Sequence, residues 1–321
     1  MRALVLEGQL RLDTQVPMPI MQPDQALLKI RKAGICNTDL EIIAGYKGFS
    51  GILGHEFVAE VADGPEALLG KRVVGEINVA DGTCDMCQRG IPSQCRNRTA
   101  IGITGHPGAF ADYLALASRN LHIVPDSVPD DSAVFVEPLA AALQTIEAVH
   151  ISPRDRVVLI GAGKLGLLTA QVARLTGADT AVVVRQEKPA RLLDGWRIPA
   201  LALSEVPQHR AQVVIDCTGT PEGFAEALNL VEPRGTIILK STYKAVPKID
   251  LSLLAVNEIT VVGSRCGPFD AALRLLAAGL VDVESLIEAR YPLDAGLEAV
   301  ECAAERGMLK VLLEINSPAA G

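Results

Sequence analysis

The sequence predicts an α/β protein in which a barrel-like β domain precedes a doubly wound parallel sheet. Short strand-like segments, punctuated by proline and glycine, continue to about Val124. From about Ser132, apolar runs of strand length alternate with segments of helical spacing. A glycine-rich turn, Gly161-Ala-Gly-Lys-Leu-Gly166, directly follows the first of these apolar runs. Such alternation is typical of a parallel sheet with helices on both faces.

Length and composition indicate a globular protein of two domains. A chain of 321 residues is too long for one ordinary core. The chain has no apolar run of about 18 residues, so we expect no membrane segment. A net charge of −8, with acidic and basic residues interspersed, argues against nucleic acid or an anionic membrane as a partner.

The N-terminus and the cysteines favour a cytoplasmic location. Residues 1–7 reach an acidic side chain without the long apolar region of a signal peptide. The chain has seven cysteines, and an odd number suits metal ligation or buried thiols better than a disulfide framework.

In the first half of the chain the strands are short and separated by turns. We expect them at residues 3–6, 26–30, 57–61 and 72–77. Prolines at 17, 19 and 23 mark a connection between the first two.

In the second half the elements alternate. We expect strands at residues 157–160, 181–184, 213–216, 235–239 and 259–262. The helices of this half are expected at residues 137–149, 165–175, 271–280 and 297–305, before a closing strand at 310–314.

The stretch from Cys36 to Glu56 carries the side chains of a reaction centre. It holds Cys36, Thr38 and Asp39, a glycine-rich interval, and then Gly54-His55-Glu56. Thiolate, imidazole and carboxylate are the side chains that bind Zn²⁺, and a catalytic zinc uses three of them while a fourth position stays open.

The Gly161 to Gly166 turn has the pattern of a dinucleotide-binding loop of the Rossmann type. A buried-type strand ends at Ile160 and a helix begins inside the motif, as that unit requires. Gly161 allows the tight turn, Gly163 lets the backbone approach a pyrophosphate, and Gly166 permits close packing of helix on strand. We expect Lys164 and Leu165, between these glycines, to contact the cofactor as well.

The residues after the second strand of this half favour NADP(H) over NAD(H). In such folds an acidic residue at the strand end binds the ribose 2′-hydroxyl of NAD, whereas an arginine accommodates the 2′-phosphate of NADP. Here Arg185 follows Val184, and a guanidinium suits phosphate. Glu187, two residues further, keeps NAD open as the alternative.

Taken together, these residues resemble the zinc-containing alcohol dehydrogenases of the medium-chain dehydrogenase/reductase superfamily. The resemblance extends over essentially the whole chain. It rests on residues 34–39, 54–56, the Cys84 to Cys95 cluster, residues 136–139 and the glycine turn, all in the order of that family. It implies a GroES-like catalytic domain of residues 1–137 and 268–321 and a Rossmann cofactor domain of residues 138–267.

The resemblance assigns roles around the catalytic zinc. Cys36 and His55 correspond to ligands in that family. The Glu-Pro-Leu segment at Glu137 looks like the polyol and sugar dehydrogenase branch, so Glu56 and Glu137 compete for the remaining positions. Thr38 would relay the proton, and Asp39 would orient His55.

A second, structural zinc site is implied by Cys84, Cys87 and Cys95. The family has four cysteines in this lobe, and here Asp81 stands where the first would be. Because a carboxylate oxygen also ligates zinc, Asp81 can complete the site. The alternative is three reduced thiols without metal.

The implied activity is zinc-dependent hydride transfer between NAD(P) and an alcohol–ketone pair, with a secondary alcohol, polyol or sugar-like substrate. We expect the nicotinamide and the zinc to meet in a cleft. We also expect a homo-oligomer, either a dimer or a tetramer, because members of the family form such oligomers. Two alternatives are a zinc-independent NADPH quinone or enoyl reductase, and a non-catalytic nucleotide-binding module.

Overall fold

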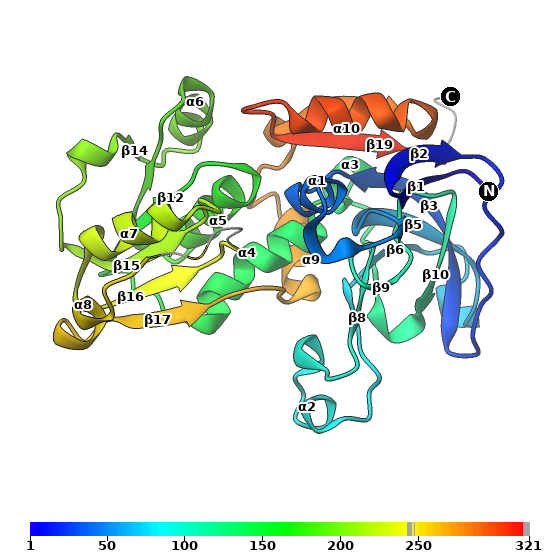
Figure 1. The fold of residues 1–321 in the computed structure, drawn as a ribbon, viewed down its shortest axis with the longest axis horizontal. Coiled ribbons are helices and arrows are strands. Elements are labelled where there is room, and N and C mark those ends of the chain that lie inside the picture. The colour runs from blue at the N-terminus through cyan, green and yellow to red at the C-terminus, as the bar shows by residue number, and fades with distance from the viewer. Residues whose placement is uncertain (243–245, 247, 317–321) are drawn as a thin grey trace. The chain divides into compact units, whose positions relative to one another are not determined.

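The chain folds into two compact units, shown in the computed structural model of Figure 1, which describes residues 1–242, 246 and 248–316. Unit 1 comprises Met1–Glu137 and Phe269–Gly321, and unit 2 comprises Pro138–Pro268. The chain therefore leaves unit 1 once and returns to it for its last segment. Among the described residues, no helix has both the length and the apolar character needed to cross a bilayer.

Unit 1 is built on a seven-stranded sheet with the strand order β11-β6-β5-β3-β19-β18, in which β10 also pairs with β3. Its strands are β3 (Gln25–Gly34), β5 (Glu56–Asp63), β6 (Arg72–Gly75), β10 (Tyr113–Ala117), β11 (Leu121–Ile123), β18 (Ile287–Pro292) and β19 (Lys310–Glu314). Alternate residues of β3 are buried from Ala26 to Ile30, as expected of a strand with one face on the core. β19 pairs antiparallel with β3, so the C-terminal segment completes this sheet.

Smaller elements surround the seven-stranded sheet. Two three-stranded sheets have the orders β2-β1-β4 and β7-β8-β9. Their strands are β1 (Ala3–Glu7), β2 (Gln9–Asp13), β4 (Gly51–Ile52), β7 (Asn78–Val79), β8 (Thr99–Ile101) and β9 (Gly105–His106). The helices that lie wholly in this unit are α1 (Asn37–Ile43), α2 (Asp85–Gln88), α3 (Asp130–Ala133), α9 (Phe269–Ala277) and α10 (Gly296–Ala304).

Unit 2 is a six-stranded sheet with the strand order β14-β13-β12-β15-β16-β17, and every pair in it is parallel. The strands are β12 (Arg156–Ile160), β13 (Asp179–Val183), β14 (Ala200–Leu201), β15 (Ala211–Asp216), β16 (Val231–Leu239) and β17 (Thr260–Gly263). The helices are α5 (Lys164–Leu175), α6 (Glu187–Gly195), α7 (Pro221–Leu230) and α8 (Leu251–Val256), with α4 (Val136–Ala148) beginning at the boundary with unit 1. The predicted parallel sheet is confirmed.

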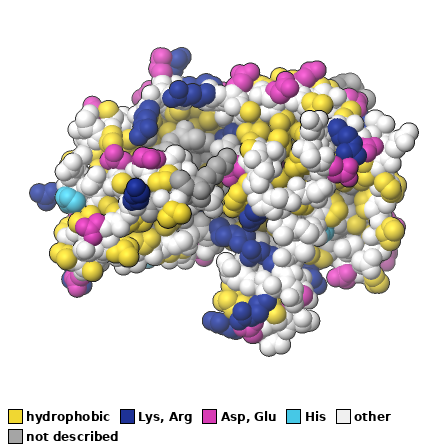
Figure 2. Space-filling model, in the orientation of Figure 1, with side chains coloured by type: hydrophobic (Ala, Val, Ile, Leu, Met, Phe, Trp, Pro, Cys, Tyr) yellow, Lys and Arg dark blue, Asp and Glu magenta, His cyan; other side chains and the backbone are white. Residues whose placement is uncertain are grey.

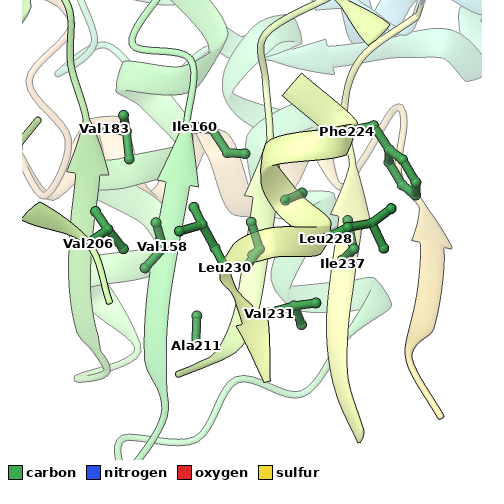
Figure 3. Packing of buried hydrophobic residues seen from close by; sticks show 12 residues of the cluster. Val158, Ile160, Val183, Val206, Ala211, Phe224, Leu228, Leu230, Val231 and Ile237 are labelled. Atoms are coloured by element: carbon green, nitrogen blue, oxygen red, sulfur yellow. The ribbon is translucent and has the colours of Figure 1, made fainter. Parts of the chain in front are cut away.

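The core of unit 2 lies between the sheet and its helices. Figure 3 shows Val158 and Ile160 of β12, Ala211 of β15 and Ile237 of β16 in one buried cluster with Phe224 and Leu228 of α7. Because the strands are parallel, Ile160, Val183 and Asp216 end at the same edge of the sheet. The residues that follow these strand ends therefore lie close together.

Three local predictions were wrong. No strand was predicted between residues 7 and 13, but β2 forms there because Leu10 and Leu12 alternate with polar side chains and pair with β1. The strand at 72–77 ends at Gly75. The helix at 271–280 ends at Ala277, because Gly279 adopts a left-handed conformation with φ +65°.

Figure 2 shows acidic and basic side chains interspersed over one face of the molecule, as the sequence predicts from its charge pattern. Both signs occur over unit 1 and over unit 2 on this face.

Candidate active site

Cys36 stands at the beginning of helix α1, where side-chain and backbone groups of Asp39 fix its position. The backbone N–H of Cys36 donates to Asp39 Oδ2 at 2.8 Å, and the N–H of Asp39 donates to the carbonyl of Cys36 at 3.2 Å. These reciprocal bonds close the first turn of the helix, with the Asp39 carboxylate capping the N–H of Cys36. The Cys36 Sγ lies 3.7 Å from Thr38 Oγ1, so the predicted thiol and hydroxyl are neighbours.

His55 is positioned by a glycine before it and a buried carboxylate beside it. Gly54 has φ +94°, and a Cβ there would overlap the Phe110 ring, so only glycine fits. His55 is 3% exposed, and its Nδ1 lies 3.3 Å from Oδ1 of the fully buried Asp39. Neither atom has an aligned hydrogen bond, so the contact is mainly ionic. Because Asp39 faces Nδ1, the other ring nitrogen is left to ligate a metal.

The pKa of His55 is raised well above its usual range. Burial by itself lowers this pKa, but the negative charge of the adjacent Asp39 raises it by more. A bound cation would supply the positive charge that Asp39 stabilises.

Glu56, the first residue of β5, forms a buried ion pair with Lys310, the first residue of β19. Each side chain is 2% exposed. Burial by itself lowers the pKa of Lys310, but the charges of Glu56 and Cys36 raise it above its usual value, so Lys310 is an ammonium. A Cβ at Gly34 would lie 2.7 Å from Glu56 Oε2, so this glycine leaves space for the carboxylate.

Cys36, His55 and Glu56 form a cluster whose ligand atoms all lie within 4.8 Å of one another. This set offers one thiolate, one imidazole and one carboxylate, which fits a zinc ion. Glu56 has a second carboxylate oxygen besides the one paired with Lys310. Glu137 lies in the first turn of α4 and is not a member of this cluster of described residues.

The second predicted cluster also comes together. The ligand atoms of Asp81, Cys84, Cys87 and Cys95 all lie within 4.8 Å of one another. Asp81 Oδ1 accepts from the N–H groups of Thr83 and Cys84 at 2.8 and 3.1 Å. These bonds lower the pKa of the Asp81 carboxyl. The N–H of Arg96 lowers the pKa of Cys84 to about 7, whereas burial and the neighbouring thiols raise the pKa of Cys87 to about 12. The backbone of this lobe thus stabilises the thiolate of Cys84 in particular.

The glycine turn has the geometry that a pyrophosphate needs. Gly161 has φ +97°, and a Cβ there would lie 2.6 Å from the backbone of Cys217. A Cβ at Gly166 would overlap the carbonyl oxygen of Gly161. Gly163, by contrast, faces open space at the N-terminus of the 12-residue helix α5. Two glycines therefore serve packing, and the third leaves the N-terminus of α5 accessible to an anion.

Arg185 is exposed beyond the end of β13, as expected from the sequence. Glu187, the acidic alternative for binding ribose, is paired with Arg191 at 3.1 Å. This acidic alternative therefore contacts a cation on the surface of α6.

Lys310 is the site residue that sequence reasoning missed. It was assigned only to the closing strand, yet it is buried against Glu56 and lies 5.4 Å from the centre of the Phe135 ring. One signal was available, because a lysine begins an otherwise apolar strand, Val311 to Leu313.

Comparison with known families agrees with both units. Residues 22–126 match the family described as "Alcohol dehydrogenase GroES-like domain". Residues 199–278 match the family described as "Zinc-binding dehydrogenase". The predicted combination of a GroES-like domain with a Rossmann sheet is confirmed.

Individual relatives are dehydrogenases of small hydroxylated molecules. The chain is 34% identical over 226 residues to L-threonine 3-dehydrogenase of Mesorhizobium japonicum, an alignment that covers 67% of this chain and 65% of that protein. It is 31% identical over 280 residues to L-threonine 3-dehydrogenase of Deinococcus radiodurans, covering 80% and 79%. It is 27% identical over 325 residues to D-arabitol-phosphate dehydrogenase of Enterococcus avium, covering 93% and 92%.

Among solved structures, the chain is similar to a zinc-binding dehydrogenase from Sinorhizobium meliloti 1021 in complex with NADP. The TM-score is 0.88 at 29% sequence identity, and the match covers 98% of each chain.

Proposed function

Because the chain belongs to the zinc-containing alcohol dehydrogenases of the medium-chain dehydrogenase/reductase superfamily, we propose that it transfers a hydride between a nicotinamide cofactor and an alcohol–ketone pair. The observation that carries this proposal is the cluster of Cys36, His55 and Glu56 within 4.8 Å, with the carboxylate of Asp39 behind His55. Unit 1 would be the catalytic domain and unit 2 the cofactor domain.

In this proposal the residues of unit 1 hold zinc and handle the proton. Cys36, His55 and either Glu56 or Glu137 ligate the ion, and Asp39 keeps His55 oriented for ligation. Bound zinc supplies Lewis-acid polarisation of the substrate oxygen. Thr38 accepts the hydroxyl proton of the substrate and passes it outward, because its hydroxyl both donates and accepts. Asp81, Cys84, Cys87 and Cys95 hold a second, structural zinc.

The substrates for which the relatives are named favour a polar alcohol as the substrate of this chain. Threonine and arabitol phosphate both carry secondary hydroxyl groups, and their dehydrogenases are similar to this chain. A secondary alcohol, polyol or sugar-like molecule is therefore the proposed substrate class.

A panel of alcohols and ketones, followed by nicotinamide absorbance with and without a metal chelator, tests the function. We expect polyol oxidation that is lost after chelation and regained with zinc. Activity that survives complete metal removal would favour a zinc-independent quinone or enoyl reductase. Specific cofactor binding with no turnover of any substrate would favour a nucleotide-binding module.

The preferred cofactor is proposed to be NADP(H), since Arg185 is exposed where the ribose 2′-phosphate would lie and Glu187 is paired with Arg191. The similar structure from Sinorhizobium meliloti binds NADP. The turn residues Gly161, Gly163, Lys164, Leu165 and Gly166 would contact the pyrophosphate.

Replacing Arg185 by aspartate should reverse the cofactor preference. A charged hydrogen bond of about 1.5–3 kcal/mol is lost and a repulsion is added, so the NADP/NAD ratio of kcat/KM should fall by about 100-fold. Arg185→Lys keeps the charge and serves as the control, with most of the preference retained. An unchanged ratio in Arg185→Asp would refute the role of this residue.

A homo-oligomer is also proposed, formed through unit 2. β17 is the last strand in the described sheet, and three of its four residues are exposed. Val261 on this strand is 37% exposed, and Leu251 and Val256 of α8 are 67% and 79% exposed. An exposed apolar sheet edge of this kind can pair with the same edge of a second copy of the chain.

We expect Val261→Arg to raise the Kd of the oligomer at least tenfold, because it places a charge in the apolar contact. A tenfold change in Kd corresponds to about 1.4 kcal/mol of association free energy. Light scattering during gel filtration over a range of concentrations measures the effect. Ile20→Arg, at an 85% exposed position in unit 1, is the matched control and should leave the mass unchanged. A monomeric parent protein would disprove the proposed assembly.

The proposed location is the cytoplasm. None of the seven cysteines, all of which lie in the described residues, is in a disulfide, which suits a reducing compartment.

A further inference from the structure

Unit 1 holds a cavity of about 490 Å³ lined by the segments 47–52 and 103–107. The first segment contains β4, which pairs with β1, and the second contains β9, which pairs with β8. Ile52 lies three residues before His55, so the wall of the cavity begins within about 11 Å of this candidate zinc ligand. The cavity wall and this candidate ligand therefore lie on one short segment of unit 1, at a separation that a polyol carrying an end group can approach.

The charge of the lining differs from that of the chain as a whole. The chain has a net charge of −8, whereas the lining contains Lys47 as its charged side chain and no carboxylate. Ser50 and Thr104 add hydroxyl groups, and Phe49 and Ile52 add apolar surface. The wall is mainly apolar and its one ammonium group is that of Lys47, so the cavity favours an anionic group over a cationic one at this point.

Lys47 is held in a conformation that its own side chain disfavours. Its backbone has φ 61° and ψ −1°, the left-handed region that glycine prefers, and Gly45 and Gly48 on either side also have positive φ. Such strain in a residue other than glycine persists where the fold imposes it, and it is concentrated at ligand sites. Among the ion pairs found within the described residues, none includes Lys47, and its Nζ lies 5.5 Å from the centre of the Tyr46 ring. The ammonium is therefore available to an anion from outside the chain.

His106, on the opposite segment, complements Lys47. Its Nδ1 lies 2.8 Å from the carbonyl oxygen of Pro107, and because that oxygen can only accept, Nδ1 carries the proton. Burial lowers the pKa of His106, which keeps the ring neutral at neutral pH. Nε2 then has a free lone pair, which suits a hydroxyl donor of the substrate and not a second anion.

We propose that this cavity selects substrates with an anionic end group, a carboxylate or a phosphate, through Lys47, while His106 accepts a hydrogen bond from a substrate hydroxyl. The substrate class would then be acidic polyols, namely aldonates or polyol phosphates. This inference rests on the proposed function, because it assumes that the reacting carbon lies at the zinc cluster.

The test compares neutral polyols with aldonates and polyol phosphates of the same chain length, using the zinc-loaded protein and its cofactor. In Lys47→Gln we expect KM for the anionic substrates to rise tenfold or more, with kcat changed less than twofold. The reason is that Lys47 would bind the end group equally in the bound substrate and in the transition state. KM for neutral polyols should change less than twofold. Lys47→Arg should restore the anion preference, and Lys71→Gln, an exposed lysine outside the cavity, should behave as the parent. The aldonate and phosphate arms show which anion is preferred.

Salt and direct binding give independent readouts. KM of the parent for anionic substrates should rise with ionic strength, and Lys47→Gln should lose most of this dependence. Calorimetric titration with a polyol phosphate should show at least tenfold weaker binding in Lys47→Gln. Equal binding by Lys47→Gln and the parent, or a parent that binds neutral polyols as tightly as the anions, would overturn the inference.

The two proposals fail in different ways. Binding of the anion that depends on Lys47, without oxidation of any alcohol, would refute the function and leave the anion site standing. Zinc-dependent oxidation of polyols without anion preference would refute the anion site and leave the function standing.

Discussion

His55→Ala should lose the catalytic zinc and at least about 1000-fold in kcat/KM, because the ion contributes several kcal/mol of stabilisation to the transition state. His55 is 3% exposed, and removal of its imidazole leaves the fully buried Asp39 without the ring that it contacts at 3.3 Å. Cys36→Ala should have the same effect, since it removes the thiolate from the same cluster.

Elemental analysis of the variants shows which of the two candidate zinc sites has lost its ion. The two clusters predict two zinc ions per chain, so His55→Ala should retain one and Cys84→Ser should retain the other. His150→Ala, at an exposed position in unit 2, is the matched control and should retain both. Two zinc ions in His55→Ala would exclude this residue as a ligand. A variant that keeps its far-UV circular dichroism but loses one zinc would support the assignment.

The parts of the molecule that sequence could predict are those with a local pattern. The strand 157–160 and the glycine turn were predictable because an apolar run and a glycine motif are adjacent in the chain. Cys36 and His55 could be proposed as ligands because each lies in a short motif with its neighbours, and the two do meet in one cluster. α1 was not predicted, because its start depends on the reciprocal hydrogen bonds between Cys36 and Asp39 and not on apolar spacing.

The parts that sequence could not predict depend on distant contacts. Lys310 lies 254 residues after Glu56, and the two meet only because β19 pairs with β3 in the sheet that also contains β5. Nothing near Glu56 in the sequence indicates a cation. Whether Glu56 or Glu137 ligates zinc therefore depends in part on Lys310, which pairs with Glu56 and which the motifs around either glutamate do not include.

Lys310→Met should destabilise unit 1 by about 3–5 kcal/mol, because it leaves the buried carboxylate of Glu56 without its partner. Methionine has a similar length, so little of the loss comes from an empty space. Urea unfolding should show a midpoint lower by about 1 M or more. The double variant Glu56→Gln/Lys310→Met removes both charges and should recover most of the loss, whereas independent effects would simply add.

The same variant decides whether Glu56 touches the metal. If Glu56 is a ligand, zinc neutralises its carboxylate, and Lys310→Met should cost clearly less stability in the zinc-loaded protein than in the chelated protein. If Glu56 serves only as the partner of Lys310, the loss should be the same in both states. In that case Glu137→Gln, and not Glu56→Gln, should weaken zinc binding. Because the two carboxylates predict opposite orders of zinc affinity, one pair of metal titrations distinguishes them.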